Sequence, residues 1–122
     1  MQTLIMVFLG GGLGSLCRYG ISRVITPTES GFPAATFWSN VISCLILGFL
    51  IGFFMEKSGE SKWQLMLVTG FCGGFSTFST FSAETFVLLS KGDYLFAGLN
   101  ILLSVIVCLI CIFVGLKSVS LL

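Results

Sequence analysis

The chain has 122 residues, of which 56% are hydrophobic and 9% are charged, and its formal net charge is +1. A soluble domain carries about 25% charged residues, so the composition excludes a water-soluble domain and indicates a membrane protein. Because a spanning helix needs about 20 apolar residues, the chain has room for about four spans. The balanced charge excludes a basic nucleic-acid surface, and the absence of histidine excludes the common His-dependent enzymes, so we expect no enzyme.

The first predicted span covers residues 3–25 and carries glycines and one charged residue at membrane depth. Gly10 and Gly14 form a GxxxG pair, which lets two helices approach closely. Arg18 lies about two turns from the helix end. A guanidinium at this depth either reaches the interface as an anchor or attracts an anion, and the sequence leaves both roles open.

The second predicted span covers residues 34–55 and has an amide near its start. Asn40 is either a hydrogen-bonding link between helices or a donor that faces a pore. Gly48 and Gly52 form a second GxxxG pair. A polar, charged loop is predicted at 56–62.

The third predicted span, residues 63–89, has the most unusual sequence. Gly73 and Gly74 are followed by interleaved hydroxyl and phenylalanine residues at 75–82. This composition weakens helical hydrogen bonding and predicts a helix break at membrane depth, which is tolerated only where protein or water covers it. Carbonyl and N–H groups freed by such breaks are ion ligands in channels and transporters.

Two phenylalanines in this span predict a site for a small anion. Phe78 and Phe81 are three residues apart and share a helix face. The edge of a phenyl ring is electropositive, so paired edges beside hydroxyl and amide donors suit a small dehydrated anion. Glu84 follows one turn later, where a wet vestibule can accommodate it. An ordinary lipid-facing row of phenylalanines is the alternative, which the interleaved hydroxyls disfavour.

The last predicted span covers residues 94–116. Asn100, Ser104 and Cys108 are spaced by four residues and line up on one face. All five cysteines lie in apolar stretches, and we interpret them as packing residues. Cys108 and Cys111 have the spacing of a metal or redox motif, but no second ligand pair accompanies them.

Loop charges decide the orientation of a membrane protein, and here they are nearly balanced. Lys57, Lys62 and Lys117 fall on one side, whereas Arg23 and Lys91 fall on the other, joined by Arg18 if that side chain extends outward. Such a chain can insert in both senses and pair as an antiparallel dimer. Alternatively, a single extra charge is enough to orient it.

Three motifs in this order resemble those of the Fluc (CrcB) fluoride channel family. Residues 73–82 closely resemble the family signature, residues 11–19 its first-helix motif, and residues 36–40 its second. The resemblance extends over the whole chain. It implies an all-α integral membrane protein with four transmembrane helices, the third broken mid-membrane, assembled as an antiparallel dual-topology dimer. The implied function is passive, fluoride-selective export across a bacterial plasma membrane, which lowers cytoplasmic fluoride toxicity.

The same resemblance implies roles for individual residues. It implies that the ring edges of Phe78 and Phe81 meet dehydrated fluoride, and that a structural Na+ lies at the dimer interface. The implied site residues are Asn40, Ser79, Thr80 and Ser104 as further pore-lining groups, Arg18 and Glu84 in the vestibule, and the backbone carbonyls of Gly73 and Ser76 as Na+ ligands. The sequence departs from the family pattern at Trp38, Ser39 and Cys108, the last at a position where a hydroxyl is frequent.

Two other functions are compatible with a chain of this size and with four spans. A small multidrug-type, proton-coupled cation exporter needs a carboxylate in its first span, but residues 3–25 contain none. A non-transporting assembly subunit would need only the GxxxG faces. The sequence also leaves open whether the partner is an identical chain or a diverged sister chain.

Overall fold

The computed structural model describes residues 1–29, 31–55 and 61–121, and that part of the chain is helical with no strand. Three helices are continuous: α1 (Gln2–Val24), α2 (Ala34–Met55) and α6 (Tyr94–Val119). The third span is composite and consists of α3 (Lys62–Gln64), the π-helical η1 (Leu65–Cys72), α4 (Gly73–Phe75) and α5 (Phe78–Ser90).

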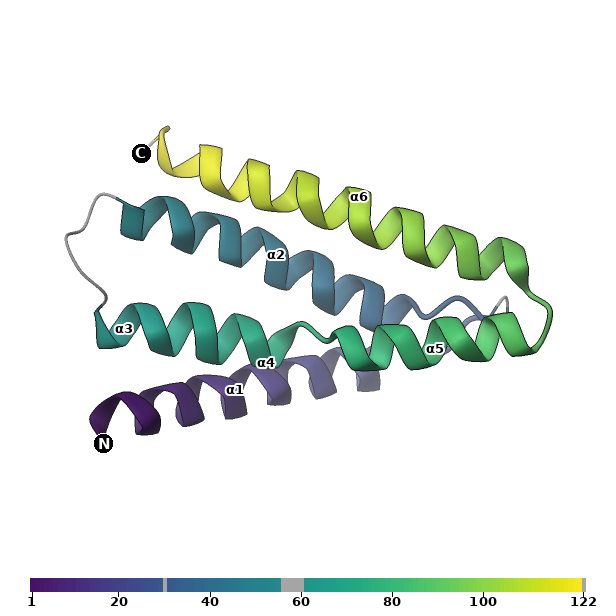
Figure 1. Ribbon diagram of the computed structural model, residues 1–122, viewed down its shortest axis with the longest axis horizontal. Helices are drawn as coiled ribbons and strands as arrows, with labels where there is room; N and C mark the ends of the chain where they lie inside the picture. Colours follow the sequence, from purple (N-terminus) through teal and green to yellow (C-terminus); the bar gives the residue numbers. More distant parts are fainter. Residues whose placement is uncertain (30, 56–60, 122) are drawn as a thin grey trace.

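Within the described ranges, four helical segments are long and apolar enough to cross a membrane, which confirms the predicted all-α fold with four spans. Their ends fall within a few residues of the predicted ones. Both termini lie at the same end of the bundle (Figure 1). Most of the predicted polar loop at 56–62 lies outside the described residues.

The helices α2 and α6 run parallel and side by side (Figure 1). A Cβ atom on Gly48 would overlap the backbone of Ile112, and one on Gly115 would overlap the carbonyl of Leu45. Gly52 lies against Leu116 one turn further along. The second GxxxG pair therefore allows the two backbones to touch, as predicted.

The helix α1 packs in the same way against η1 and α4. A Cβ atom on Gly10 would overlap the carbonyl of Met66, and one on Gly14 would overlap the carbonyl of Phe71. On the third span, Gly74 faces α1, and a Cβ atom there would overlap the carbonyl of Gly11. The first GxxxG pair is thus also a packing surface within one chain.

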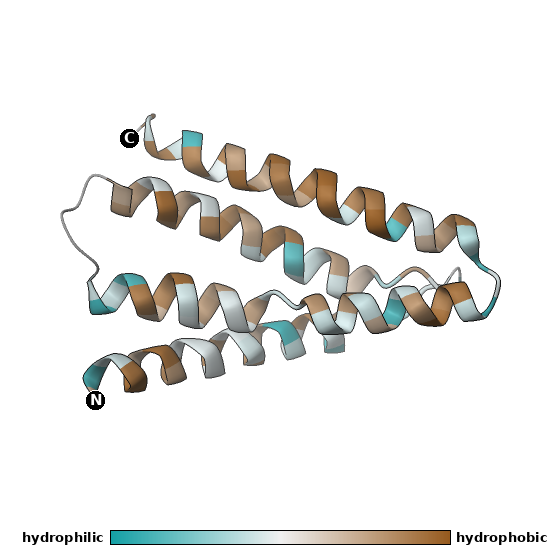
Figure 2. Cartoon of the chain, in the orientation of Figure 1, coloured by the Kyte–Doolittle hydropathy of each residue, from teal (hydrophilic) through white to brown (hydrophobic). Residues whose placement is uncertain are grey.

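The bundle buries several polar side chains beside a small apolar core of Leu50, Phe54 and Cys72, and its exterior is apolar. Figure 2 shows apolar residues along every span. Ser39, Ser43 and Asn100 are each only 1% exposed, whereas Phe8 is 79% exposed and Leu109 is 63% exposed. This arrangement is the one expected of helices surrounded by lipid, where polar groups must find partners inside the bundle.

Candidate ion pathway

The third span breaks at Ser76 and Thr77, which both have extended backbone conformations. The predicted break is confirmed, but the glycine pair itself stays helical in α4, and the break follows it. Thr77 caps the next helix, because its Oγ1 accepts a hydrogen bond from the N–H of Thr80 at 3.3 Å. The π-helical turn before the break was not predicted from the sequence.

The break leaves the last carbonyl groups before it without their usual helical donors, and those of Gly73 and Ser76 are among them. In a continuous helix the N–H of residue i bonds the carbonyl of residue i−4. The N–H of Thr77 instead donates to Oδ1 of Asn40 at 2.8 Å, so Gly73 loses this partner. The N–H of Thr80 bonds Thr77, so Ser76 loses its partner as well. These are the two carbonyls predicted to hold a cation.

Neighbouring carbonyls at the break are already hydrogen bonded. The carbonyl of Cys72 accepts bonds from Oγ of Ser43 at 3.0 Å and Oγ of Ser76 at 2.9 Å. The carbonyl of Gly74 accepts a bond from Nε of Arg18 at 3.3 Å. The side chain of Arg18 is half-buried and turns inward at the break, and its role toward an anion stays a prediction.

An open groove of about 270 Å³ runs beside the break, and it is lined by aromatic, amide and hydroxyl groups. The ring centroids of Phe78 and Phe81 are 5.7 Å apart, with an angle of 35° between the ring planes. Asn40 reaches this groove from α2 and Ser104 from α6. The structure thus brings four of the predicted pore residues together. We call this the phenylalanine groove; its remaining lining residues are Cys44, Ser76, Thr77, Val105 and Cys108.

A second groove, of about 370 Å³, is lined by the predicted vestibule residues Arg18 and Glu84, and we call it the vestibule groove. Thr80 lines this vestibule groove, whereas Ser79 lines neither of the two. Within one chain, the hydroxyl residues predicted to line the pore, Ser79, Thr80 and Ser104, therefore do not share one groove. Thr77, which had no predicted role of its own, connects the two grooves, since it lines the phenylalanine groove and its Oγ1 donates to Oγ1 of Thr80 at 3.1 Å.

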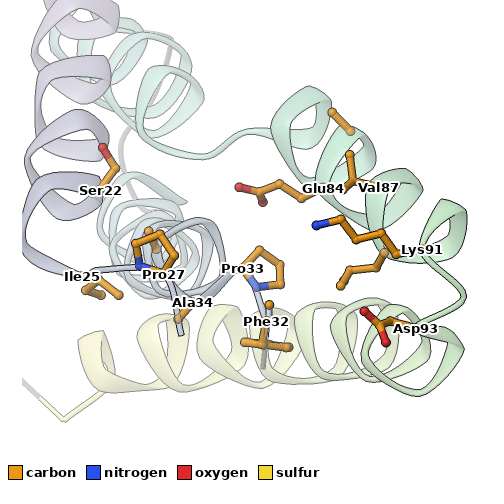
Figure 3. Close-up of a pocket in the computed structure, with 14 residues that line it drawn as sticks. Ser22, Ile25, Pro27, Phe32, Pro33, Ala34, Glu84, Val87, Lys91 and Asp93 are labelled. Carbon is orange, nitrogen blue, oxygen red and sulfur yellow. The ribbon is translucent and has the colours of Figure 1, made fainter. Parts of the chain in front are cut away.

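The carboxylate of Glu84 is only half satisfied by the described residues. Its Oε1 accepts a hydrogen bond from Oγ1 of Thr36 at 3.0 Å, whereas its Oε2 is buried and has no donor among them. Figure 3 shows this carboxylate facing a cavity of about 450 Å³ that Lys91 and Asp93 also line. An unpaired buried oxygen is unfavourable, so this atom needs a water molecule or a proton.

A buried network fixes Ser104 at the edge of the phenylalanine groove. Nδ2 of Asn100 donates to Oγ1 of Thr85 at 2.9 Å, and Oγ of Ser104 donates to Oδ1 of Asn100 at 3.4 Å. The predicted shared face of α6 is therefore split: Ser104 and Cys108 line the groove, whereas Asn100 is buried behind Ser104 and bonds to it.

Comparison with known proteins identifies the family. The family model described as "CrcB-like protein, Camphor Resistance (CrcB)" matches residues 5–116. The chain belongs to the CrcB-like family. This membership confirms the resemblance seen in the sequence motifs.

Three relatives of this CrcB-like chain are each named fluoride-specific ion channel FluC. The protein of Pyrococcus abyssi is 46% identical over 116 residues, covering 94% of both chains. That of Methanococcus maripaludis is 41% identical over 115 residues, covering 94% of this chain and 93% of the relative. That of Escherichia fergusonii is 37% identical over 107 residues, covering 87% and 84%.

Proposed function

We propose that this CrcB-like protein is a fluoride-specific ion channel, not an enzyme, and that it lets fluoride leave the cell passively across the plasma membrane. The names of its relatives support this function over nearly the whole chain. The observation that carries the proposal is the phenylalanine groove, where two aromatic rings lie next to an amide and a hydroxyl beside a broken helix.

The chemistry of the groove suits a small anion that has lost its water. Phe78 and Phe81 offer electropositive ring edges. Nδ2 of Asn40 makes only a long bond of 3.4 Å to the carbonyl of Thr77, so it can turn to an anion as a donor. None of the lining residues is acidic. Arg18, at the adjoining vestibule groove, raises the local concentration of anions.

A structural Na+ fits the carbonyls of Gly73 and Ser76. Both carbonyls lack their usual helical donors, and oxygen atoms are the ligands that hard cations prefer. Gly73 is exposed, and nothing lies within 4 Å of the place where its Cβ would be. A second chain can therefore approach this carbonyl, so we place the ion at the interface between two chains.

The same surface supports an antiparallel homodimer. Thr69, Ser79 and Ser82 are exposed on the third span at membrane depth, where lipid offers their hydroxyls no partner. A second copy, inserted in the opposite sense, would bury these hydroxyls against its own polar surface. The nearly balanced loop charges permit both insertions.

Growth of a fluoride-sensitive bacterium that lacks its own fluoride exporter tests this function. Expression of this chain alone is expected to restore growth in fluoride medium, while a Phe81→Ile variant expressed at the same level is not. Equal sensitivity with and without the wild-type chain would contradict the proposal or show that a sister chain is needed. Co-expression with such a sister chain separates these two outcomes. Resistance to lipophilic cations in place of fluoride would indicate the proton-coupled exporter instead.

A further inference from the structure

Two cysteines face each other across the contact between α2 and α6. Cys44 on α2 and Cys108 on α6 line the same groove. The stagger of the two parallel helices explains this pairing. Gly48 lies against Ile112 and Gly52 against Leu116, and one helical turn before the first of these contacts the same stagger places Cys44 opposite Cys108.

Both thiols can be reached from the phenylalanine groove. Cys44 and Cys108 are half-buried, and both line the groove together with Asn40 and Ser104. One further turn back, the stagger places Asn40 opposite Ser104. The groove therefore has an amide and a hydroxyl at one level and two thiols at the next.

We propose that Cys44 and Cys108 form a binding site for a soft, thiophilic metal ion such as Hg²⁺ or Cu⁺, and that the bound ion obstructs the phenylalanine groove. The second half of this proposal depends on the proposed channel function, whereas the first does not. Thiolates select soft metals, whereas Na⁺, Mg²⁺ and Ca²⁺ prefer oxygen ligands.

The number of ligands favours an ion that accepts two. A structural zinc site needs four ligands, drawn mainly from Cys and His. No group of three or more His, Cys, Asp or Glu residues that could hold a metal occurs in the described ranges. Two thiolates are enough for Hg²⁺ or Cu⁺. Each thiol loses its proton when it binds the metal, and no electron is transferred.

Thiol counting on the purified full-length protein tests the site directly. One equivalent of Hg²⁺ is added per chain, the remaining thiols are alkylated, and the labelled cysteines are identified by mass spectrometry. We expect Hg²⁺ to protect Cys44 and Cys108 together. Because two linked ligands bind far more tightly than one, Cys44→Ser or Cys108→Ser should weaken Hg²⁺ binding by about 100-fold.

The matched control is Cys17→Ser, which removes an exposed thiol on α1. It should leave Hg²⁺ binding and the protection of the pair unchanged. The alanine variants Cys44→Ala and Cys108→Ala repeat the test if a serine variant does not fold. Hg²⁺ binding that is as tight in the Cys44 and Cys108 variants as in the wild type would overturn the proposed site.

Fluoride efflux from liposomes tests the obstruction. Hg²⁺ at one equivalent per chain should stop efflux through the wild type and Cys17→Ser, and a dithiol should restore it. Efflux through each Cys44 or Cys108 variant should stay at its own metal-free rate. Metal bound at the pair with unchanged wild-type efflux would overturn the obstruction. If the untreated wild type shows no efflux, this chain alone is not a channel, and thiol counting still decides the metal site.

Discussion

The N–H of Thr77 donates a hydrogen bond of 2.8 Å to Oδ1 of Asn40, and Nδ2 of Asn40 lies 3.4 Å from the carbonyl of Thr77. One side chain of α2 thus satisfies the backbone N–H of the residue at the break and lies close to its carbonyl. Because Asn40 also lines the phenylalanine groove, the amide that holds the break open is the same one that can meet an anion.

Asn40→Asp separates these two roles. The carboxylate still accepts the hydrogen bond from Thr77, but it removes the Nδ2 donor and adds a negative charge to the groove. Two like charges 4 Å apart repel by about 4 kcal/mol at an effective dielectric constant of about 20, so we expect fluoride efflux to fall by at least about tenfold. The variant should elute from a sizing column as the wild type does. Wild-type efflux would contradict the role of Asn40 in the pathway.

Asn40→Ala tests the structural role. It leaves the half-buried N–H of Thr77 without its acceptor, and a fully buried unsatisfied donor would cost about 1–3 kcal/mol. The midpoint of thermal unfolding in detergent should therefore fall below that of Asn40→Asp. Equal midpoints for the two variants would show that Asn40 does not hold the break.

Phe81→Ile tests the aromatic edge. Isoleucine is apolar like phenylalanine, but it has no electropositive ring edge. We expect fluoride efflux to be lost while the protein stays folded. The matched control is Phe86→Ile on the same helix, where Phe86 is 69% exposed and outside the lining of the groove, and efflux should persist. Equal efflux through both variants would exclude a role for the ring of Phe81.

The sequence predicted the four spans well because long apolar runs are a direct signal of membrane insertion. It predicted a break in the third span from two glycines and a run of hydroxyls, but the chain opens at Ser76 and Thr77 because Asn40 competes for an N–H there. That competition depends on a residue from another helix, which local composition does not reveal.

The contacts between side chains of different helices also could not be predicted from the sequence. Periodicity placed Asn100, Ser104 and Cys108 on one face of α6, but it could not show that Asn100 turns to Thr85. Nor could it show that Cys108 lies opposite Cys44, since that placement depends on the stagger between α2 and α6. The GxxxG pairs were recognisable, because only small residues allow such close approach, although their partners were not.

Gly14→Ala tests the packing of α1 on the third span. The added methyl group would overlap the carbonyl of Phe71, which belongs to the backbone and cannot move aside easily. Overpacking of this kind costs about 1–3 kcal/mol, so the thermal unfolding midpoint should fall. The control is Gly20→Ala, because nothing lies within 4 Å of the Cβ position at Gly20. A Gly14→Ala midpoint equal to that of the control would contradict the packing.

Replacement of Na+ by a large organic cation such as N-methylglucamine tests the proposed ion site. The carbonyls of Gly73 and Ser76 would lose the ion that they bind. We therefore expect a lower unfolding midpoint and slower fluoride efflux, and Na+ should restore both. Ser76→Ala should keep this Na+ dependence, because it removes only the side chain, whose Oγ bonds Cys72. Identical behaviour with and without Na+ would refute the site.

Fluoride efflux from liposomes that contain only this purified chain tests the central claim most directly. The vesicles are loaded with potassium fluoride or potassium chloride, and valinomycin carries the counter-charge. The account predicts rapid release of fluoride, measured with a fluoride electrode, and retention of chloride. Fluoride release no faster than from protein-free vesicles, or equal release of both anions, would contradict it.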